Sequence, residues 1–181
     1  MAVSRSISMW YAGFKAAVFA LLACNAAIYL FRGTVSQALD AMAWLTLLIL
    51  FALETGFGGQ FRDGRAAAAV RIARLIAAIA VGAAVMGYSY ENKWLDTVNT
   101  ALWIMVVVLL ELEVRLPGAV ARRRAWFVAT AAILYSGLAA LVLVWAWRSE
   151  WFDAYDALLW LAAFATIEMD VLRTSRQKIS A

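Results

Sequence analysis

The groups with which this chain could do chemistry are carboxylate, amide and indole side chains that recur at a fixed spacing. Three tryptophans, 59 and 57 residues apart, mark the recurrence: Trp44, Trp103 and Trp160. Four residues before each tryptophan lies an acid or an amide: Asp40, Asn99 and Asp156. Ten residues after each lies an acid: Glu54, Glu113 and Asp170. Where such acids lie inside a membrane they bind cations or relay protons, and an indole face also binds cations.

The acids that follow the tryptophans have two interpretations. Besides the three already named, Glu111 and Glu168 lie eight residues after the second and third tryptophans. All five lie near arginines, at the C-terminal ends of predicted helices, where the helix dipole disfavours negative charge. They form ion pairs with those arginines at the level of the lipid headgroups, or they form a ring of acids around a pathway that selects cations.

The polar residues at the other end of these helices also have structural explanations. Asp96 and Asp153 lie in the first turn of their helices, where a carboxylate caps free N–H groups and meets the positive end of the dipole. The residues four before each tryptophan lie about a turn deeper, and either serve a pathway or form hydrogen bonds between helices. The tryptophans either pack in the core or form a constriction. We expect Asn25 to bond to a neighbouring helix.

The composition excludes several classes of chemistry. The chain has no histidine and one cysteine, Cys24, so it offers no His-based metal or haem site, no internal disulfide and no His general base. No P-loop, GxSxG, HExxH or CxxC motif occurs. We therefore expect no enzyme activity, no cofactor and no bound metal.

The elements that must position these residues are transmembrane helices. Hydrophobic residues make up 66% of the chain, charged residues only 15%, and the mean hydropathy is +0.79, values that indicate a membrane protein. Six apolar runs of about 20 residues each are long enough to span a bilayer. They are residues 11–31, 37–55, 69–88, 95–114, 126–147 and 152–172. A cleaved signal peptide is the competing interpretation of the first run, but the run is longer than the usual h-region.

The basic residues predict how the helices are oriented. With six spans, alternate loops place 13 of the 16 lysines and arginines on one face and only Arg32, Lys93 and Arg148 on the other. Such a bias places the basic face in the cytoplasm, so both termini are expected there. The net charge of +4 then reflects topology, and no nucleic-acid partner is expected. The predicted location is the inner (cytoplasmic) membrane of a bacterium.

The recurrence also predicts the architecture. Each repeat of about 58 residues contains two spans, and all three repeats have the same orientation. We expect an all-α, polytopic membrane protein of six transmembrane helices, built as three parallel helical-hairpin repeats with pseudo-threefold symmetry. The repeats cover about residues 11–60, 69–118 and 124–175 of a single integral membrane domain, 1–181. The second helix of each repeat carries the polar groups on one face, over about 25 Å of its length.

Two hypotheses of function follow. The first is a small channel or transporter for a cation, a proton or a small polar solute, with a pathway lined by the second, fourth and sixth helices. The second is a non-transporting assembly factor or accessory subunit of a larger membrane complex, in which the polar face packs the bundle or meets a partner. The expected partners are the lipid bilayer, a small cation or a proton, and a membrane protein or a second copy of this chain.

Overall fold

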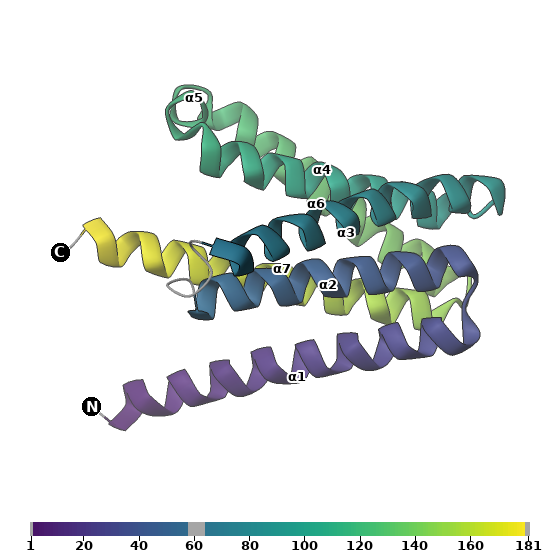
Figure 1. The fold of residues 1–181 in the computed structure, drawn as a ribbon, viewed down its shortest axis with the longest axis horizontal. Coiled ribbons are helices and arrows are strands. Elements are labelled where there is room, and N and C mark those ends of the chain that lie inside the picture. The colour runs from purple at the N-terminus through teal and green to yellow at the C-terminus, as the bar shows by residue number, and fades with distance from the viewer. Residues whose placement is uncertain (1, 58–63, 180–181) are drawn as a thin grey trace. The chain divides into compact units, whose positions relative to one another are not determined.

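Within the described residues, all regular secondary structure is helical. The computed structural model describes the backbone of residues 2–57 and 64–179, and the side chains of residues 10–53, 64–113, 115–116, 118–166. Its helices are α1 (Ala2–Arg32), α2 (Val35–Phe57), α3 (Gly64–Tyr90), α4 (Trp94–Arg115), α5 (Pro117–Arg122), α6 (Arg124–Trp147) and α7 (Trp151–Ile179) (Figure 1). The predicted all-α class is therefore confirmed for these residues.

Five of these helices are long and apolar enough to cross a membrane. The apolar stretches are Trp10–Arg32, Val35–Leu53, Gly64–Tyr90, Trp94–Glu113 and Arg124–Trp147. The sixth predicted span, residues 152–172, falls in α7, where the side chains beyond residue 166 lie outside the described part. Membrane insertion is thus supported by five helices, and the count of six spans remains a prediction.

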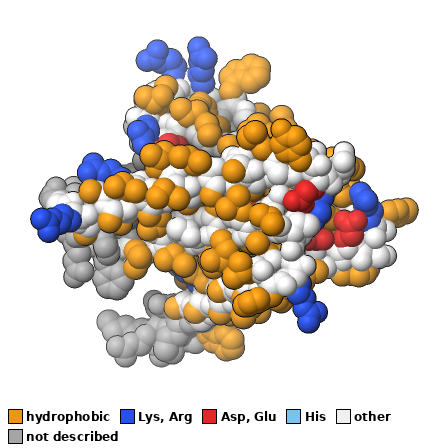
Figure 2. Space-filling view, turned by 45° about the vertical axis from the view of Figure 1, so that its right-hand side comes forward, with side chains coloured by type: hydrophobic (Ala, Val, Ile, Leu, Met, Phe, Trp, Pro, Cys, Tyr) orange, Lys and Arg blue, Asp and Glu red, His pale blue; other side chains and the backbone are white. Residues whose placement is uncertain are grey.

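The exposed surface has the composition that a bilayer requires. Large apolar side chains of α3 are between 59% and 63% exposed: Ile72, Leu75, Ile76 and Ile79. Hydrophobic side chains spread over much of the face in Figure 2, whereas charged side chains gather mainly toward its edges. An apolar surface of this extent would promote aggregation in water, but it is the expected surface against lipid chains.

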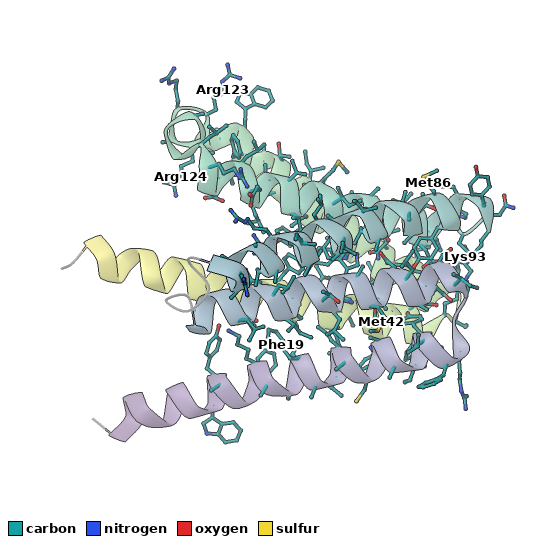
Figure 3. The ribbon with its side chains drawn as sticks, viewed as in Figure 1. Phe19, Met42, Met86, Lys93, Arg123 and Arg124 are labelled. Atoms are coloured by element: carbon teal, nitrogen blue, oxygen red, sulfur yellow. The ribbon has the colours of Figure 1, made fainter. Side chains whose placement is uncertain are left out.

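The chain divides into two compact units. Residues 1–25 and 138–181 form the first unit, and residues 26–137 form the second. In the second unit α2 and α3 lie side by side along most of their length, and α4 packs against α3 (Figure 1). Lys93, in the turn between α3 and α4, marks one end of this unit, and Arg123 and Arg124 lie at its other end (Figure 3). We refer to these as the Lys93 end and the Arg123 end.

The contact between α2 and α3 depends on a glycine. The buried residues of α3 recur at helical spacing and include Ala77, Val81, Ala84 and Tyr88. Beside them, a Cβ atom on Gly87 would lie 2.2 Å from Oγ of Ser36 in α2 and 3.1 Å from its Cβ. No side chain fits at this point. The two backbones therefore approach closely, as they do at small-residue contacts between transmembrane helices.

Two of the helical hairpins turn in the same way, 57 residues apart. A hydrogen bond of 2.9 Å from Lys93 N to Tyr88 O closes α3, and a bond of the same length from Glu150 N to Trp145 O closes α6. The residue before each donor is left-handed: Asn92 (φ 57°) and Ser149 (φ 63°). This is the Schellman arrangement. Its recurrence matches the offset of the second and third tryptophans, whereas the threefold arrangement of three repeats remains a prediction.

The first hairpin, between α1 and α2, is built differently. The side chain of Gln37 accepts a hydrogen bond from Thr34 N at 3.1 Å, and the hydroxyl of Thr34 accepts one from Gln37 N at 3.4 Å. This reciprocal pair is a capping box, which satisfies two free N–H groups at the start of α2. Gln37 begins the polar face of α2, and its first role is to fix where the helix starts.

Some helix boundaries differ from the predicted ones. The first helix begins at Ala2, so residues 2–10, which precede the predicted span, are also part of α1. The short α5 was not predicted; Pro117 stands at its start, where the missing N–H group costs nothing. Asp96 and Asp153 do lie in the first turns of α4 and α7, as expected. There the positive end of the dipole favours a carboxylate.

Candidate functional site

The spacing of four between acid and tryptophan has a structural meaning. The side chain of Trp44 forms a hydrogen bond with the carboxyl group of Asp40, and Trp160 does the same with Asp156. Residues four apart face each other on a helix, so the indole N–H of one reaches the carboxyl oxygen of the other. The acid and the tryptophan of each such pair therefore contact each other directly, in addition to lying on the same face of the helix.

Asp40 is the centre of a polar group in the second unit, which we call the Asp40 cluster: Asp40, Trp44, Tyr88 and Thr100. Oδ2 of Asp40 accepts hydrogen bonds from the hydroxyl of Thr100 at 3.1 Å and from that of Tyr88 at 3.3 Å. Tyr88 comes from α3 and Thr100 from α4, so three helices meet at one carboxyl group. Tyr88 and Thr100 are 3% and 1% exposed, which places both donors in the core.

The other carboxyl oxygen of Asp40 is in a different situation. Oδ1 is buried and has no hydrogen-bond partner among the described residues. The groups that act most strongly on this carboxyl are Thr100, Tyr88 and Trp44, together with the like charge of Asp96. None of these carries a positive charge. Asp40 is thus a carboxyl group inside a membrane-spanning stretch whose strongest partners are neutral donors and another acid.

Further acidic charge lies at the Lys93 end. Glu91 accepts a hydrogen bond from Ser36 at 2.6 Å and one from Thr34 at 2.7 Å, and Lys93 lies 3.9 Å from its carboxylate. The bonds from Ser36 and Thr34 lower the pKa of Glu91, which lies outside the spans, so it is ionised at neutral pH. The charges of Glu91, Asp96 and Asp40 all act on Tyr88. Three acidic groups thus act on the buried hydroxyl of Tyr88, and Lys93 lies close enough to Glu91 to offset part of its charge.

Asn99 stands where Asp40 stands one repeat earlier, but its surroundings differ. Its Oδ1 is buried and, within the described residues, has no hydrogen-bond partner. Trp103, one turn further on, is 4% exposed and belongs to the core of the second unit. Trp44 is buried as well, at 8%. Both tryptophans of this unit are therefore part of its buried core, and a constriction at these residues stays a prediction.

In the first unit, Asp156 holds two helices together. Nδ2 of the buried Asn25 in α1 donates to Oδ1 of Asp156 in α7 at 2.8 Å. The expected bond from Asn25 to a neighbouring helix is thus confirmed, and its partner is one of the predicted pathway residues. In a second hydrogen bond between these helices, the hydroxyl of Tyr11 donates to the backbone oxygen of Thr166 at 2.9 Å. The ring of Trp160 lies 6.5 Å from that of Phe164.

The acids predicted at the C-terminal helix ends are only partly described. Glu111 forms an exposed ion pair with Arg115, one turn further along α4. Glu113 is exposed. The side chains of Glu54, Glu168 and Asp170 lie outside the described part, so their predicted grouping is not tested. For Glu111 the ion-pair interpretation is the one observed, and an exposed pair of this kind adds about 0–1 kcal/mol to stability.

Sequence reasoning missed Tyr88 and Thr100. One signal for Tyr88 was present, because an aromatic residue lies 15 positions before each of the three tryptophans: Tyr29, Tyr88 and Trp145. Tyr88 and Trp145 are both 3% exposed. Thr100 has no such signal, since alanines occupy the equivalent positions 41 and 157. Its role depends on how α4 is rotated against α2, and this rotation cannot be derived from a single sequence.

The long apolar helices among the described residues indicate an integral membrane protein of the helical type. No cluster of three or more metal-binding side chains occurs among the described residues. Comparisons with protein-family models, with curated proteins and with solved structures found no match.

Proposed function

We propose that this protein is a small membrane channel or transporter for a cation or a proton, and that Asp40 is the group that binds it. The observation that carries the proposal is the carboxyl group of Asp40, held by neutral donors within a span, with one buried oxygen that no described residue engages. Ionisable residues in such places commonly belong to ion or proton pathways.

Energies favour uptake of a positive charge at this carboxyl. An ionised acid at the centre of a transmembrane helix costs about 2.5–3.5 kcal/mol on insertion scales, and less toward the ends. Hydrogen bonds between transmembrane helices contribute only about 0.6 kcal/mol each on average. Three neutral donors therefore offset part of the cost, and a proton or a cation at the free oxygen offsets the rest.

The acidic residues at the Lys93 end support the same proposal. In this proposal Glu91 and Asp96 attract cations toward the Asp40 cluster, as acidic groups do at the mouths of cation channels. Asp40 lies five residues into α2, about 8 Å from its start, so an ion that approaches from this end has a short distance to travel. Tyr88 and Thr100 then hold the carboxyl group in a fixed orientation.

The test is ion flux into liposomes that contain the purified protein. We expect proton or cation flux in the wild type and a drop of at least tenfold in Asp40→Asn, which keeps the shape of the side chain but has no acidic proton. The matched control is Glu150→Gln, because Glu150 is also an acid but lies in a turn and pairs with Arg148 at 3.2 Å. Equal flux in the wild type and Asp40→Asn would refute the role of Asp40.

A non-transporting membrane subunit is the second candidate, and the first unit favours it. There the predicted pathway residue Asp156 bonds to Asn25 and Trp160, which is what a group that only packs helices does. Absence of flux in correctly folded wild-type protein would favour this function. Co-purification with one membrane partner at a fixed ratio, lost on disruption of the polar face, would then be the supporting result.

A further inference from the structure

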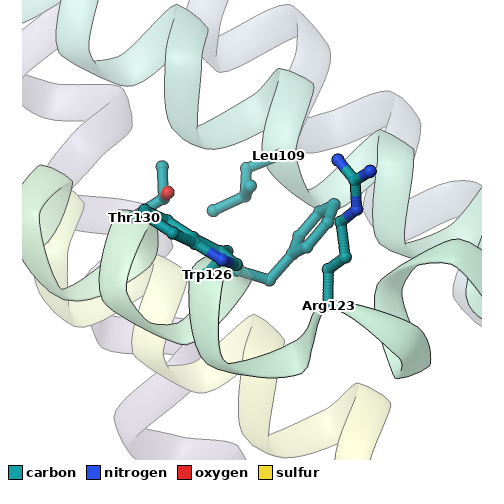
Figure 4. A pocket seen from close by; sticks show the side chains of 5 residues that line it. Leu109, Arg123, Trp126 and Thr130 are labelled. Carbon is teal, nitrogen blue, oxygen red and sulfur yellow. The ribbon is translucent and has the colours of Figure 1, made fainter.

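A groove between α4 and α6 at the Arg123 end has no part in the proposed ion pathway. It has a volume of about 350 Å³ and is lined by Leu109, Arg123, Trp126, Phe127 and Thr130. Leu109 comes from α4, Arg123 lies between α5 and α6, and Trp126, Phe127 and Thr130 follow one face of the start of α6 at helical spacing (Figure 4). The groove therefore has one basic group, one hydroxyl, and apolar or aromatic side chains for the rest of its lining.

The basic group is fixed in position by the backbone. The carbonyl oxygen of Arg123 accepts hydrogen bonds from Trp126 N at 3.0 Å and from Phe127 N at 3.2 Å, so Arg123 stands at the start of α6. Its side chain is exposed and forms no ion pair with any described residue. Arg122 and Arg124 flank it. This end of α6 thus carries positive charge that no described acid compensates, together with the positive end of the helix dipole.

We infer that this groove binds an anionic phospholipid, with its phosphate on Arg123 and an acyl chain along Leu109, Trp126 and Phe127. The charge is complementary to a phosphate, and basic pockets between transmembrane helices on the cytoplasmic side bind anionic headgroups. Thr130 lies six residues into α6, about 9 Å from its start, so the groove extends past the headgroup level into the region of the chains. Trp126 is 76% exposed, which is typical of an indole at the membrane interface.

The experiment is native mass spectrometry of the purified full chain with phosphatidylglycerol or phosphatidylcholine of identical acyl chains. We expect the wild type to retain phosphatidylglycerol preferentially, and Arg123→Gln to lower its apparent affinity about fivefold, the effect of about 1 kcal/mol for one basic residue near an anionic headgroup. The control is Arg71→Gln, because Arg71 is also exposed and on the same predicted face but lies on α3. This control should retain the lipid like the wild type.

A second variant tests the groove without a change of charge. Thr130→Phe places a ring in the groove from an exposed position, so it should fold normally and still lower lipid retention. Inorganic phosphate added at millimolar concentration should not displace the lipid, because it lacks the chain; displacement would overturn the inference in favour of a free anion. Equal losses in Arg123→Gln and Arg71→Gln, or equal retention of the two lipids, would also overturn it.

Discussion

Gly87→Ala tests the close approach of α2 and α3, on which the geometry of the Asp40 cluster depends. The added Cβ would lie 2.2 Å from Oγ of Ser36, well inside any normal contact. The hydroxyl of Ser36 can rotate away, but it would then lose its 2.6 Å hydrogen bond to Glu91. Its Cβ would still lie 3.1 Å from the new methyl group, so the helices must also move apart.

The expected destabilisation follows from three contributions. Overpacking costs about 1–3 kcal/mol. Loss of the bond to the partly exposed Glu91 costs about 0.5–1 kcal/mol. Replacing glycine by alanine inside a helix stabilises the helix by about 1 kcal/mol, because alanine has the higher helix propensity. We therefore expect Gly87→Ala to lower the free energy of unfolding by about 0.5–3 kcal/mol, with overpacking as the main cause.

The assay is reversible unfolding in mixed micelles, followed by circular dichroism, for a double-mutant cycle with Ser36→Ala. Ser36→Ala alone should lose only the hydrogen bond, and the double variant should be more stable than the sum of the two single effects predicts, since the worst clash is gone. Gly82→Ala is the control, because nothing lies within 4 Å of a Cβ at Gly82 in the same helix. A Gly87→Ala protein as stable as Gly82→Ala would refute the close contact.

Two further predictions concern the turns. Hydrogen bonds from Ser36 and Thr34 lower the pKa of Glu91, so the contribution of Glu91 to stability is present above the ordinary pKa of glutamate and is lost as the pH falls through the lowered pKa. Glu91→Gln should remove this pH dependence from the free energy of unfolding measured as a function of pH. An unchanged pH profile in Glu91→Gln would contradict the prediction. Ser149→Gly should raise the free energy of unfolding by about 0.5–1 kcal/mol, because serine is strained at φ 63°. Asn92→Gly should change it little, because asparagine tolerates the left-handed conformation. Equal effects of the two variants in a melting experiment would contradict the strain at Ser149.

The parts of the fold that depend on local sequence were predictable. Hydropathy gave the apolar stretches now seen in α1, α2, α3, α4 and α6, because the length of an apolar run is a property of the run itself. The capping box at Thr34 and Gln37 also follows a local spacing, Thr-x-x-Gln, although the sequence analysis did not predict it. The extension of α1 to Ala2 was missed because polarity at the end of a span does not say where the helix stops.

The candidate site was predictable only in outline. The spacing placed Asp40 and Trp44 on one face, and Asn25 was expected to bond to another helix. The partners themselves, Tyr88 for Asp40 and Asp156 for Asn25, depend on how helices far apart in the sequence are rotated and packed. Hydrophobic periodicity carries little information about rotation when most faces of a membrane helix are apolar.

The three equivalent polar positions have different neighbours, which argues against a ring of identical groups. Asp40 has Thr100 as a donor, but alanines stand at the equivalents of Thr100 in the other repeats. Asp156 has Asn25, whose equivalents are Ala84 and Leu141, both buried and unable to form such a bond. Asn99 carries no charge at all. A pathway that required three equal ligands would need equal surroundings, so the ion chemistry proposed for this chain rests on Asp40 alone.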